Sequence, residues 1–352
     1  MKGIILHGGH GTRLRPLTHT GPKQLLPIAN QPMSQYCVET LVNAGIKEIA
    51  FIIGGIGSNK VKEYYGDGKK FGVKFTYIQQ DSPKGIAHAI SLCEDFVNNE
   101  KFVVFLGDNI IQRKINDYIL DFEKSNAFAS LLLCEVNNPS QFGIAEIENN
   151  KIIKITEKPK NPPTNLAVTG IYFLTSYIFE VIKKLKPSWR NELEIADALQ
   201  ILVEEHKKII YGIITDFWKD TGTPNDIIEA NRIILENLPE SFQGEKEENV
   251  LLKGKIIVEQ GTSIKKGVKI SGPVIIGENC IIEGNAVING NTSIGKNSHL
   301  SNCNISNSII MENCIIEGKL TIKNSIIASN SKIVKDQNEK KFLLGEGTQI
   351  SL

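Results

Sequence analysis

The first two thirds of the chain alternate short apolar runs with stretches of helical periodicity. Runs rich in β-branched and aromatic residues predict strands at 3–6, 48–53, 74–78, 102–106, 129–136, 143–148, 152–156, 166–173 and 209–214. Between them, apolar residues at three- and four-residue spacing predict helices at 34–44, 86–96, 115–124 and 194–205. This alternation is typical of an α/β domain with a mostly parallel sheet.

A polar segment then interrupts the pattern. Residues 239–249 are rich in Glu, Lys, Gln and Gly, which is typical of an exposed connection. We therefore expect a first domain at 1–237, a linker at 238–250, a second domain at 251–335 and a tail at 336–352.

Beyond the linker, apolar positions recur every six residues. The aliphatic positions are Val258, Ile264, Ile270, Ile276, Ile282, Ile288, Ile294 and Leu300, and mostly small residues follow four positions later at Thr262, Val268, Val274, Cys280, Ala286, Thr292 and Ser298. Hexapeptide repeats predict a parallel β-helix, in which three repeats make one coil and the aliphatic side chains point inward. The register slips after Leu300 and resumes at Ile310, so we expect about four coils from the repeat length.

Composition limits the classes of function. The 352 residues include 40 basic and 39 acidic side chains, so a basic surface for nucleic acid is not expected and an anionic ligand must be held locally. The six cysteines show no CxxC pair or zinc-like His spacing, which favours buried reduced thiols. The amino terminus has too few apolar residues for a signal peptide, and no apolar run approaches membrane-spanning length. We expect a cytoplasmic protein without membrane contact.

The first predicted strand runs directly into HGGHGTRLRP. Gly8, Gly9 and Gly11 stand where a parallel sheet presents the crevice at its carboxyl ends, and glycines let backbone N–H groups approach phosphate oxygens. The stretch matches neither the GxGxxG fingerprint nor a P-loop, and alone it fits a plain turn equally well. The three cations that follow, Arg13, Arg15 and Lys23, favour a polyphosphate ligand.

The stretch GGHGTRLRPLTHTGPKQLLPIANQPM resembles the signature of the sugar-1-phosphate nucleotidyltransferases, particularly the glucose-1-phosphate thymidylyltransferases. Further motifs agree in order and spacing, namely QDSPKGIAHA, FLGDN, FGIAEI, EKPKNPP, NLAVTGIYF, PSWRNELEIADA and WKDTGTPNDIIEANRII. With the hexapeptide repeats, the chain is similar to the long-form thymidylyltransferases. The resemblance implies a Rossmann-like domain with a mostly parallel, mixed sheet, followed by a left-handed parallel β-helix.

The resemblance implies four catalytic cations. Arg13 would contact the departing pyrophosphate, where a guanidinium that keeps its charge suits the developing negative charge. Lys23 would join it on the phosphates, and Lys158 and Arg190 would hold the phosphate of the sugar.

The resemblance also implies the nucleotide and metal sites. The nucleotide would contact Leu6, Gly8, Gly9, Gly11, Thr12, Gln80 and Gly85. A side-chain amide such as that of Gln80 can pair with the edge of a pyrimidine, which favours thymine or uracil. Asp108 and Asp220 would hold Mg2+ through hard oxygen ligands, although either aspartate alone fits a turn or a helix cap.

The implied sugar site comprises Gly143, Glu157, Val168 and Gly170. The carboxylate of Glu157 would accept sugar hydroxyls, and the other three would contact the sugar through backbone atoms or close approach. Apart from the resemblance, Glu157 and Lys158 fit a solvated charge pair of little energetic value.

The chain departs from the family pattern at two histidines. His7 stands where relatives usually carry Ala, and His10 where a small residue or Lys is common. Both could contact the nucleotide, or they could pack against neighbouring strands or face solvent.

The implied reaction joins dTTP and glucose 1-phosphate by in-line displacement, releasing pyrophosphate without a covalent enzyme intermediate, in nucleotide-sugar biosynthesis of the dTDP-rhamnose type. An alternative is a UTP-dependent enzyme, which could also carry an acyltransferase in the β-helix with His299 as its base. A third interpretation makes the β-helix a structural stack that forms homo-oligomers. A protein that binds a nucleotide sugar without turnover is a further alternative.

Overall fold

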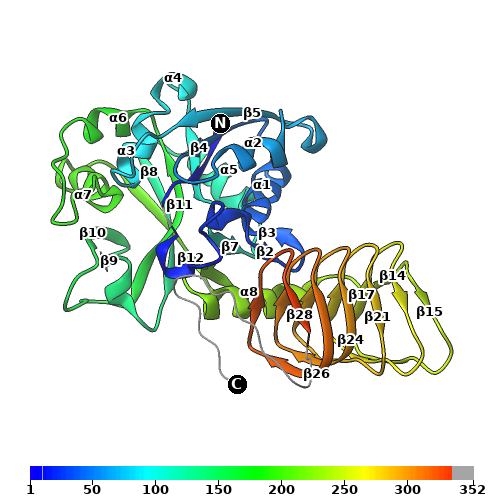
Figure 1. The fold of residues 1–352 in the computed structure, drawn as a ribbon. Coiled ribbons are helices and arrows are strands. Elements are labelled where there is room, and N and C mark those ends of the chain that lie inside the picture. Colours follow the sequence, from blue (N-terminus) through cyan, green and yellow to red (C-terminus); the bar gives the residue numbers. More distant parts are fainter. Residues whose placement is uncertain (10, 335–352) are drawn as a thin grey trace. The chain divides into compact units, whose positions relative to one another are not determined.

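The computed structural model describes residues 1–9 and 11–334, which form two compact units (Figure 1). The first comprises Met1–Gly11, Thr20–Leu25 and Met33–Asp220. The second comprises Thr12–His19, Leu26–Pro32 and the described residues from Thr221 onward. The predictions for His10 and for a tail at 336–352 fall outside the described residues.

A nine-stranded mixed sheet forms the centre of the first unit. Its strands are β1 (Lys2–His7), β4 (Glu48–Ile53), β5 (Lys74–Gln79), β6 (Phe102–Leu106), β8 (Ala129–Glu135), β9 (Gly143–Glu148), β10 (Lys151–Glu157), β11 (Leu166–Leu174) and β12 (Ile209–Ile214). The order β10-β9-β11-β6-β1-β4-β5 is extended by β8, which pairs with β11 and β12. Strands β6, β1, β4 and β5 are mutually parallel, whereas β11 is antiparallel to β6, so the expected mixed α/β sheet is confirmed.

Helices cover both faces of this sheet (Figure 1). Its central strands β1, β4 and β6 are therefore buried along nearly their whole length. One core involves α3 (Ile86–Ser91), α6 (Tyr177–Ile182) and α7 (Ile195–Glu204), and the other involves α1 (Met33–Asn43), α2 (Asn59–Tyr65) and α5 (Asn116–Lys124). The helix expected at 86–96 is two helices, because the chain turns at Leu92 and Cys93 before α4 (Glu94–Val97). Short 3-10 helices are η1 (Thr12–Leu14), η2 (Lys23–Leu25), η3 (Lys69–Phe71) and η4 (Pro139–Gln141).

The second unit contains the β-helix, whose strands stack in parallel from β14 to β28, coloured yellow to red in Figure 1. They are β14 (Ser241–Phe242), β15 (Glu245–Lys246), β16 (Leu251–Lys253), β17 (Ile256–Val258), β18 (Ser263–Ile264), β19 (Lys269–Ser271), β20 (Val274–Ile276), β21 (Ile281–Glu283), β22 (Val287–Ile288), β23 (Thr292–Ile294), β24 (His299–Ser306), β25 (Ile309–Ile310), β26 (Ile315–Lys323), β27 (Ile326–Ile327) and β28 (Lys332–Val334). The repeated aliphatic residues line its core. The predicted parallel β-helix is thereby confirmed.

The register of the coils explains the slip in the repeat. Ile264 pairs with Ile282 and Ile282 with Leu300, so each early coil advances by 18 residues, or three hexapeptides. Leu300 then pairs with Ile316, which shortens the coil to 16 residues, and Ile316 pairs with Ile333 after 17. The stack continues without interruption although the sequence period changes.

The linker expected at 238–250 is wrong over its central part. Strands β14 and β15 lie there and pair in parallel with β17 and β18, so they begin the first coil. This first coil lies at one end of the stack and is exposed to solvent. Phe242 is 40% exposed, and Glu245 and Lys246 are also exposed. Since it buries little apolar surface, it shows no hexapeptide signal.

The second unit also includes α8 (Pro224–Asn237) and a hairpin of β2 (Pro27–Ile28) and β3 (Gln31–Pro32). Helix α8 packs against β2 and β23. The outward residues Ile275, Ser293 and Ile309 on this face of the β-helix are at most 5% exposed. The compact unit therefore begins at Thr221, before the expected domain boundary at 237.

Two expectations from composition can be compared with the described residues. Their six cysteines are unpaired thiols, five of them buried and Cys134 partly exposed. No helix among the described residues is long and apolar enough to cross a membrane.

Candidate active site

The glycine-rich turn and the GDN motif lie at the same edge of the sheet. Strands β1 and β6 run parallel with Leu6 paired to Leu106, and Gly107 N donates to Leu6 O at 3.0 Å. Gly8 and Asp108 follow these paired positions by two residues each. The parallel register therefore brings two separate motifs to the carboxyl ends of adjacent strands, where α/β sheets usually bind ligands.

A small recess opens beside the turn. It is lined by Gly8, Gly9, Gly54, Gly55, Gln80 and Pro83. A Cβ atom on Gly8 would lie 3.0 Å from Gln80 Oε1, so the Gln80 amide lies against the turn. Gln80 Nε2 is 2.9 Å from His88 Nδ1, and burial, together with the nearby Lys84, lowers the pKa of His88 below its ordinary value. A neutral imidazole can accept the Gln80 N–H and fix the orientation of the amide.

Gly85 has a structural requirement of its own. Its φ of 99° lies in the left-handed range, and a Cβ would collide with the backbone of Leu193. Leu193 O accepts from Ala87 N at 3.1 Å, and Leu193 N donates to Lys84 O at 2.8 Å. The loop that carries Gln80 and Gly85 is thus fastened to the loop that carries Arg190.

Asp108 is buried beside a cation. Its carboxylate pairs with the Lys23 ammonium and accepts from Asn109 Nδ2 at 3.0 Å. Burial alone would raise the pKa of Asp108, but the Lys23 charge and the hydrogen bonds outweigh it and leave the pKa below its usual value. The carboxylate therefore stays ionised at neutral pH.

Asn109 connects the two predicted metal ligands, and sequence reasoning missed it. Its Oδ1 accepts from Trp218 Nε1 at 2.8 Å and from Gly170 N at 3.2 Å, which directs Nδ2 towards Asp108. Strands β7 (Asn109–Ile111) and β13 (Trp218–Asp220) pair antiparallel with Asn109 opposite Asp220. In the sequence, the signal for Asn109 was its place directly after Asp108 in the GDN motif; its pairing with the WKD motif depends on the fold.

The two carboxylates suit a divalent cation that shares its coordination with a substrate. Within the described part of the chain, no cluster of three or more His, Cys, Asp or Glu side chains could hold a metal alone. Asp108 and Asp220 would provide hard oxygen ligands, and phosphate oxygens and water would complete the shell. Mg2+ is commonly bound in this way.

The predicted sugar residues Gly143 and Glu157 face one another across β9 and β10. A Cβ on Gly143 would lie 3.2 Å from Glu157 Oε2. Glu157 Oε1 is 3.6 Å from Lys158 Nζ and 3.4 Å from Arg190 Nη1. The structure thus brings the predicted sugar carboxylate together with both cations predicted for the sugar phosphate.

Two further carboxylates hold Arg190, and neither was predicted. Arg190 Nη2 lies 2.5 Å from Glu192 Oε2, and Nε lies 3.8 Å from Glu194 Oε1. Burial raises the pKa of Glu157, with a smaller contribution in the same direction from Glu194, although Lys158 and Arg190 oppose the shift. Glu192 and Glu194 thus orient the Arg190 guanidinium before a ligand binds. The acidic motif NELE at 191–194 was the sequence signal for these two carboxylates.

Val168 and Gly170 lie on β11, where its pairing with β8 is irregular between Val168 and Tyr172. A Cβ on Gly170 would lie 2.7 Å from both Asn109 Oδ1 and Leu106 Cδ1. Glycine is therefore required for the approach of Asn109, whether or not this position also contacts a sugar.

Thr12 and Arg13 begin η1 and belong to the second unit. The Arg13 guanidinium lies against Gly222, where a Cβ would be 3.0 Å from Arg13 Nη2. Gly222 precedes Thr223, which caps α8 through a reciprocal capping box with Asp226. Gly222 was not singled out from the sequence, although it lies in the WKDTGT motif.

His7 packs in the core. It is 1% exposed and contacts Phe51 edge-on, with ring centroids 5.1 Å apart. Neither ring nitrogen has a hydrogen-bond partner among the residues that the structure describes, and burial lowers the pKa of His7 to about 3. Of the two interpretations offered for this residue, the structure favours packing.

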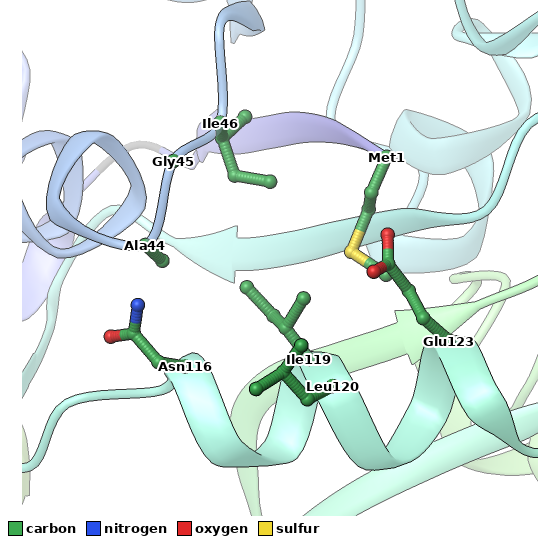
Figure 2. Close-up of a pocket in the computed structure, with 8 residues that line it drawn as sticks. All are labelled: Met1, Ala44, Gly45, Ile46, Asn116, Ile119, Leu120 and Glu123. Carbon is green, nitrogen blue, oxygen red and sulfur yellow. The ribbon is translucent and has the colours of Figure 1, made fainter.

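Another recess, of about 280 Å3, lies at the opposite end of β1 (Figure 2). Its lining is Met1, Ala44, Gly45, Ile46, Asn116, Ile119, Leu120 and Glu123, none of which was predicted as a site residue.

Comparison with known proteins decides the family. The family model described as nucleotidyl transferase matches residues 2–237. The chain belongs to the nucleotidyl transferase family. A second model, described as the GMPPB C-terminal domain, matches residues 270–351.

Similar nucleotidyltransferases narrow the class of reaction. The low-salt glycan biosynthesis nucleotidyltransferase Agl11 of Haloferax volcanii is 46% identical over 73% of this chain and 72% of its own. A glucose-1-phosphate thymidylyltransferase of Streptomyces antibioticus is 40% identical over 75% of this chain and 74% of its own. The crystal structure of a putative glucose-1-phosphate thymidylyltransferase from Bacillus anthracis, in complex with sucrose, is 42% identical, with a TM-score of 0.64, and the match covers 69% of this chain and 98% of that one. The protein is a sugar-1-phosphate nucleotidyltransferase.

Proposed function

We propose that this nucleotidyltransferase joins glucose 1-phosphate to dTTP, forms dTDP-glucose and releases pyrophosphate, with Mg2+ as its metal. Two Streptomyces relatives that bear the name glucose-1-phosphate thymidylyltransferase, 40% and 37% identical, support this substrate pair. The observation that carries the proposal is the set of groups at the carboxyl ends of the parallel strands. There Gln80 lies against Gly8, and Asp108 is held by Lys23 and Asn109.

The roles of the residues follow from their charges. Lys158 and Arg190 would hold the sugar phosphate, and Glu157 would accept hydroxyls of the sugar. Lys23 and Arg13 would bind the triphosphate. The backbone of Gly8, Gly9, Gly11 and Thr12 and the side chain of Leu6 would contact the nucleotide. The amide of Gln80 would pair with the base, and Gly85, Gly143, Val168 and Gly170 would allow close approach of the ligands.

The reaction is an in-line displacement at phosphorus. An oxygen of the sugar phosphate forms a bond to the α-phosphorus, and the bond from the α-phosphorus to the pyrophosphate oxygen breaks. Asp108 and Asp220 would hold Mg2+, which neutralises phosphate charge when bound. Arg13 and Lys23 would stabilise the charge on the departing pyrophosphate. Positioning and charge neutralisation suffice, so no covalent enzyme intermediate is required.

UTP is the alternative nucleotide. A solved UDP-glucose pyrophosphorylase in complex with UDP-glucose is 28% identical with a TM-score of 0.61, and the match covers 67% of this chain and 99% of that one. The bifunctional protein GlmU of Methanococcus maripaludis is 37% identical over 75% of this chain and 62% of its own. An acyltransferase in the β-helix is less well supported, because both ring nitrogens of His299, its candidate base, already face carboxylates of this chain. Nε2 is 2.9 Å from Glu283 Oε1, and Nδ1 is 3.7 Å from Glu317 Oε1.

The β-helix is better interpreted as structural, and we further propose that it forms homo-oligomers of a cytoplasmic enzyme. Light scattering of the purified chain would measure its mass, and a monomer at micromolar concentration would contradict the assembly.

Pyrophosphate release tests the nucleotide. The assay contains glucose 1-phosphate and Mg2+ and compares dTTP, UTP, GTP, CTP and ATP at equal concentration. Turnover led by dTTP is expected, whereas turnover led by UTP would establish the alternative.

A further inference from the structure

A buried asparagine joins three segments of the second unit. Asn231 lies on α8 and has no exposed surface. Its Oδ1 accepts from Ala29 N at 2.8 Å and from Ser293 Oγ at 2.6 Å, and its Nδ2 donates to Asn291 O at 3.2 Å. One side chain thus connects the turn of the β2–β3 hairpin with the β-helix strand β23 and the turn before it.

The hairpin turn makes a second connection to the same strand. Ala29 and Asn30 both have positive φ, at 47° and 64°, as in the two-residue turns that favour Asn. Asn30 Nδ2 donates to Ile294 O at 2.8 Å. Both turn residues are therefore bonded outside the hairpin, one to α8 and the other to β23.

These bonds bear on the segment that carries Arg13, because that segment and the hairpin belong to the same compact unit. The hairpin follows Lys23 by four residues, and the preceding segment Thr12–His19, with Arg13, belongs to the same compact unit. Arg13 lies against Gly222, one residue before the cap of α8. Arg13, the cation predicted for the triphosphate, thus lies beside the residue that precedes the N-cap of α8, and the hairpin is bonded to α8 itself.

We propose that Asn231, Asn30 and Ser293 are positioning residues for nucleotide binding, through which the β-helix fixes the segments 12–19 and 26–32 of its own compact unit. The β-helix then serves the catalytic step within its own chain, beyond any role in assembly. The inference rests on the proposed function in one respect, namely that Arg13 and its neighbours bind the triphosphate.

The chain offers matched variants for a test. Asn30→Gly keeps a residue suited to positive φ and removes the bond to Ile294 O, and Ser293→Ala removes the bond to Asn231 without touching the hairpin. Asn297 also has positive φ, at 57°, and its Nδ2 donates to Asn313 Oδ1 in the next coil. The buried Ser298 bonds within the β-helix, to Met311 O and Cys314 N. Asn297→Gly and Ser298→Ala therefore remove comparable bonds that do not involve the hairpin.

The experiment measures two quantities in the full-length chain. Steady-state kinetics give KM for dTTP and for glucose 1-phosphate, and hydrogen exchange gives the protection of residues 12–19 and 26–32. In Asn30→Gly and Ser293→Ala, KM for dTTP should rise about fivefold to tenfold, as expected for one lost hydrogen bond. KM for glucose 1-phosphate should stay unchanged, exchange in these two segments should accelerate, and both control variants should behave as wild type.

Two results would overturn the inference, and both differ from a failure of the proposed function. Unchanged exchange in 12–19 and 26–32 would show that the bonds do not hold these segments. Faster exchange with an unchanged KM for dTTP would show that holding them does not matter for the nucleotide. If wild type releases no pyrophosphate from dTTP, the proposed function is wrong, and exchange still tests whether the β-helix holds the segments.

Discussion

Asn109 Nδ2 donates to Asp108 Oδ1 at 3.0 Å. The direction of this bond is determined by the other end of the amide, because Oδ1 already accepts from Trp218 Nε1 and Gly170 N. Asp108 is a predicted metal ligand, so the amide would orient the carboxylate that holds the cation.

Asn109→Asp should therefore impair metal use while preserving the shape of the side chain. The new carboxylate cannot donate to Asp108 and would repel it, since like charges in contact disfavour joint ionisation. We expect kcat to fall by roughly tenfold to a hundredfold, the range for disturbed groups around a metal site, and the Mg2+ concentration for half-maximal activity to rise. Metal titration of turnover measures both. Asn116→Asp, on the partly exposed start of α5, serves as the control and should leave both values unchanged.

Arg13 and Gly222 should be coupled. Arg13→Ala should lower kcat by about a hundredfold or more, as for the loss of one preorganised stabilising group. Gly222→Ala places a Cβ 3.0 Å from Arg13 Nη2 and should displace the guanidinium, with a loss of about tenfold in kcat. A double-mutant cycle checks the cause. If Gly222→Ala still lowers kcat in the Arg13→Ala background, its effect does not pass through Arg13.

The affinity for the sugar phosphate should weaken at acidic pH. The pKa of Glu157 is raised, chiefly by burial, so protonation of this carboxylate begins at a higher pH than for an ordinary glutamate. Protonation removes the charged acceptor, and KM for glucose 1-phosphate should rise as the pH falls through that pKa. Glu157→Gln should have a high KM at all pH values and lose this component of the profile. The same acidic rise in KM in both proteins would mean that another group is responsible.

His7 should make stability depend on pH. Its pKa is about 3 in the folded protein against an ordinary 6.5, so between these values the unfolded chain binds one more proton. The unfolding free energy should then fall on acidification from pH 6.5, by up to about 1.4 kcal/mol per pH unit. In denaturant titrations at several pH values, His7→Leu should reduce the slope of the unfolding free energy against pH by the contribution of one proton. An unchanged slope in His7→Leu would contradict the assignment of this pH dependence to His7.

The fold could be predicted closely because both domains have strong periodic signals. Strands such as β4 bury nearly every residue and appear as continuous apolar runs, and the coils repeat every six residues while they remain regular. The first coil was not predicted, because its strands are exposed to solvent and do not require apolar residues. The break between α3 and α4 was not predicted either, because apolar residues at helical spacing continue across it.

Candidate site residues could be proposed from the sequence where a residue type suggests its chemistry, as for Asp108, Lys23, Glu157 and Arg190. The groups that orient them were missed. Asn109, Glu192 and Gly222 act through contacts with other side chains, and such contacts depend on register and loop geometry rather than on local pattern. Asn231 likewise looks like an ordinary helix residue until the hairpin and β23 are placed around it.

Pyrophosphate release from dTTP in the presence of glucose 1-phosphate and Mg2+, with a chelator control, tests the proposed reaction. We expect turnover that depends on both substrates, is fastest with dTTP among the nucleotides and stops when the metal is chelated. Absence of turnover with every nucleoside triphosphate and this sugar phosphate would contradict it.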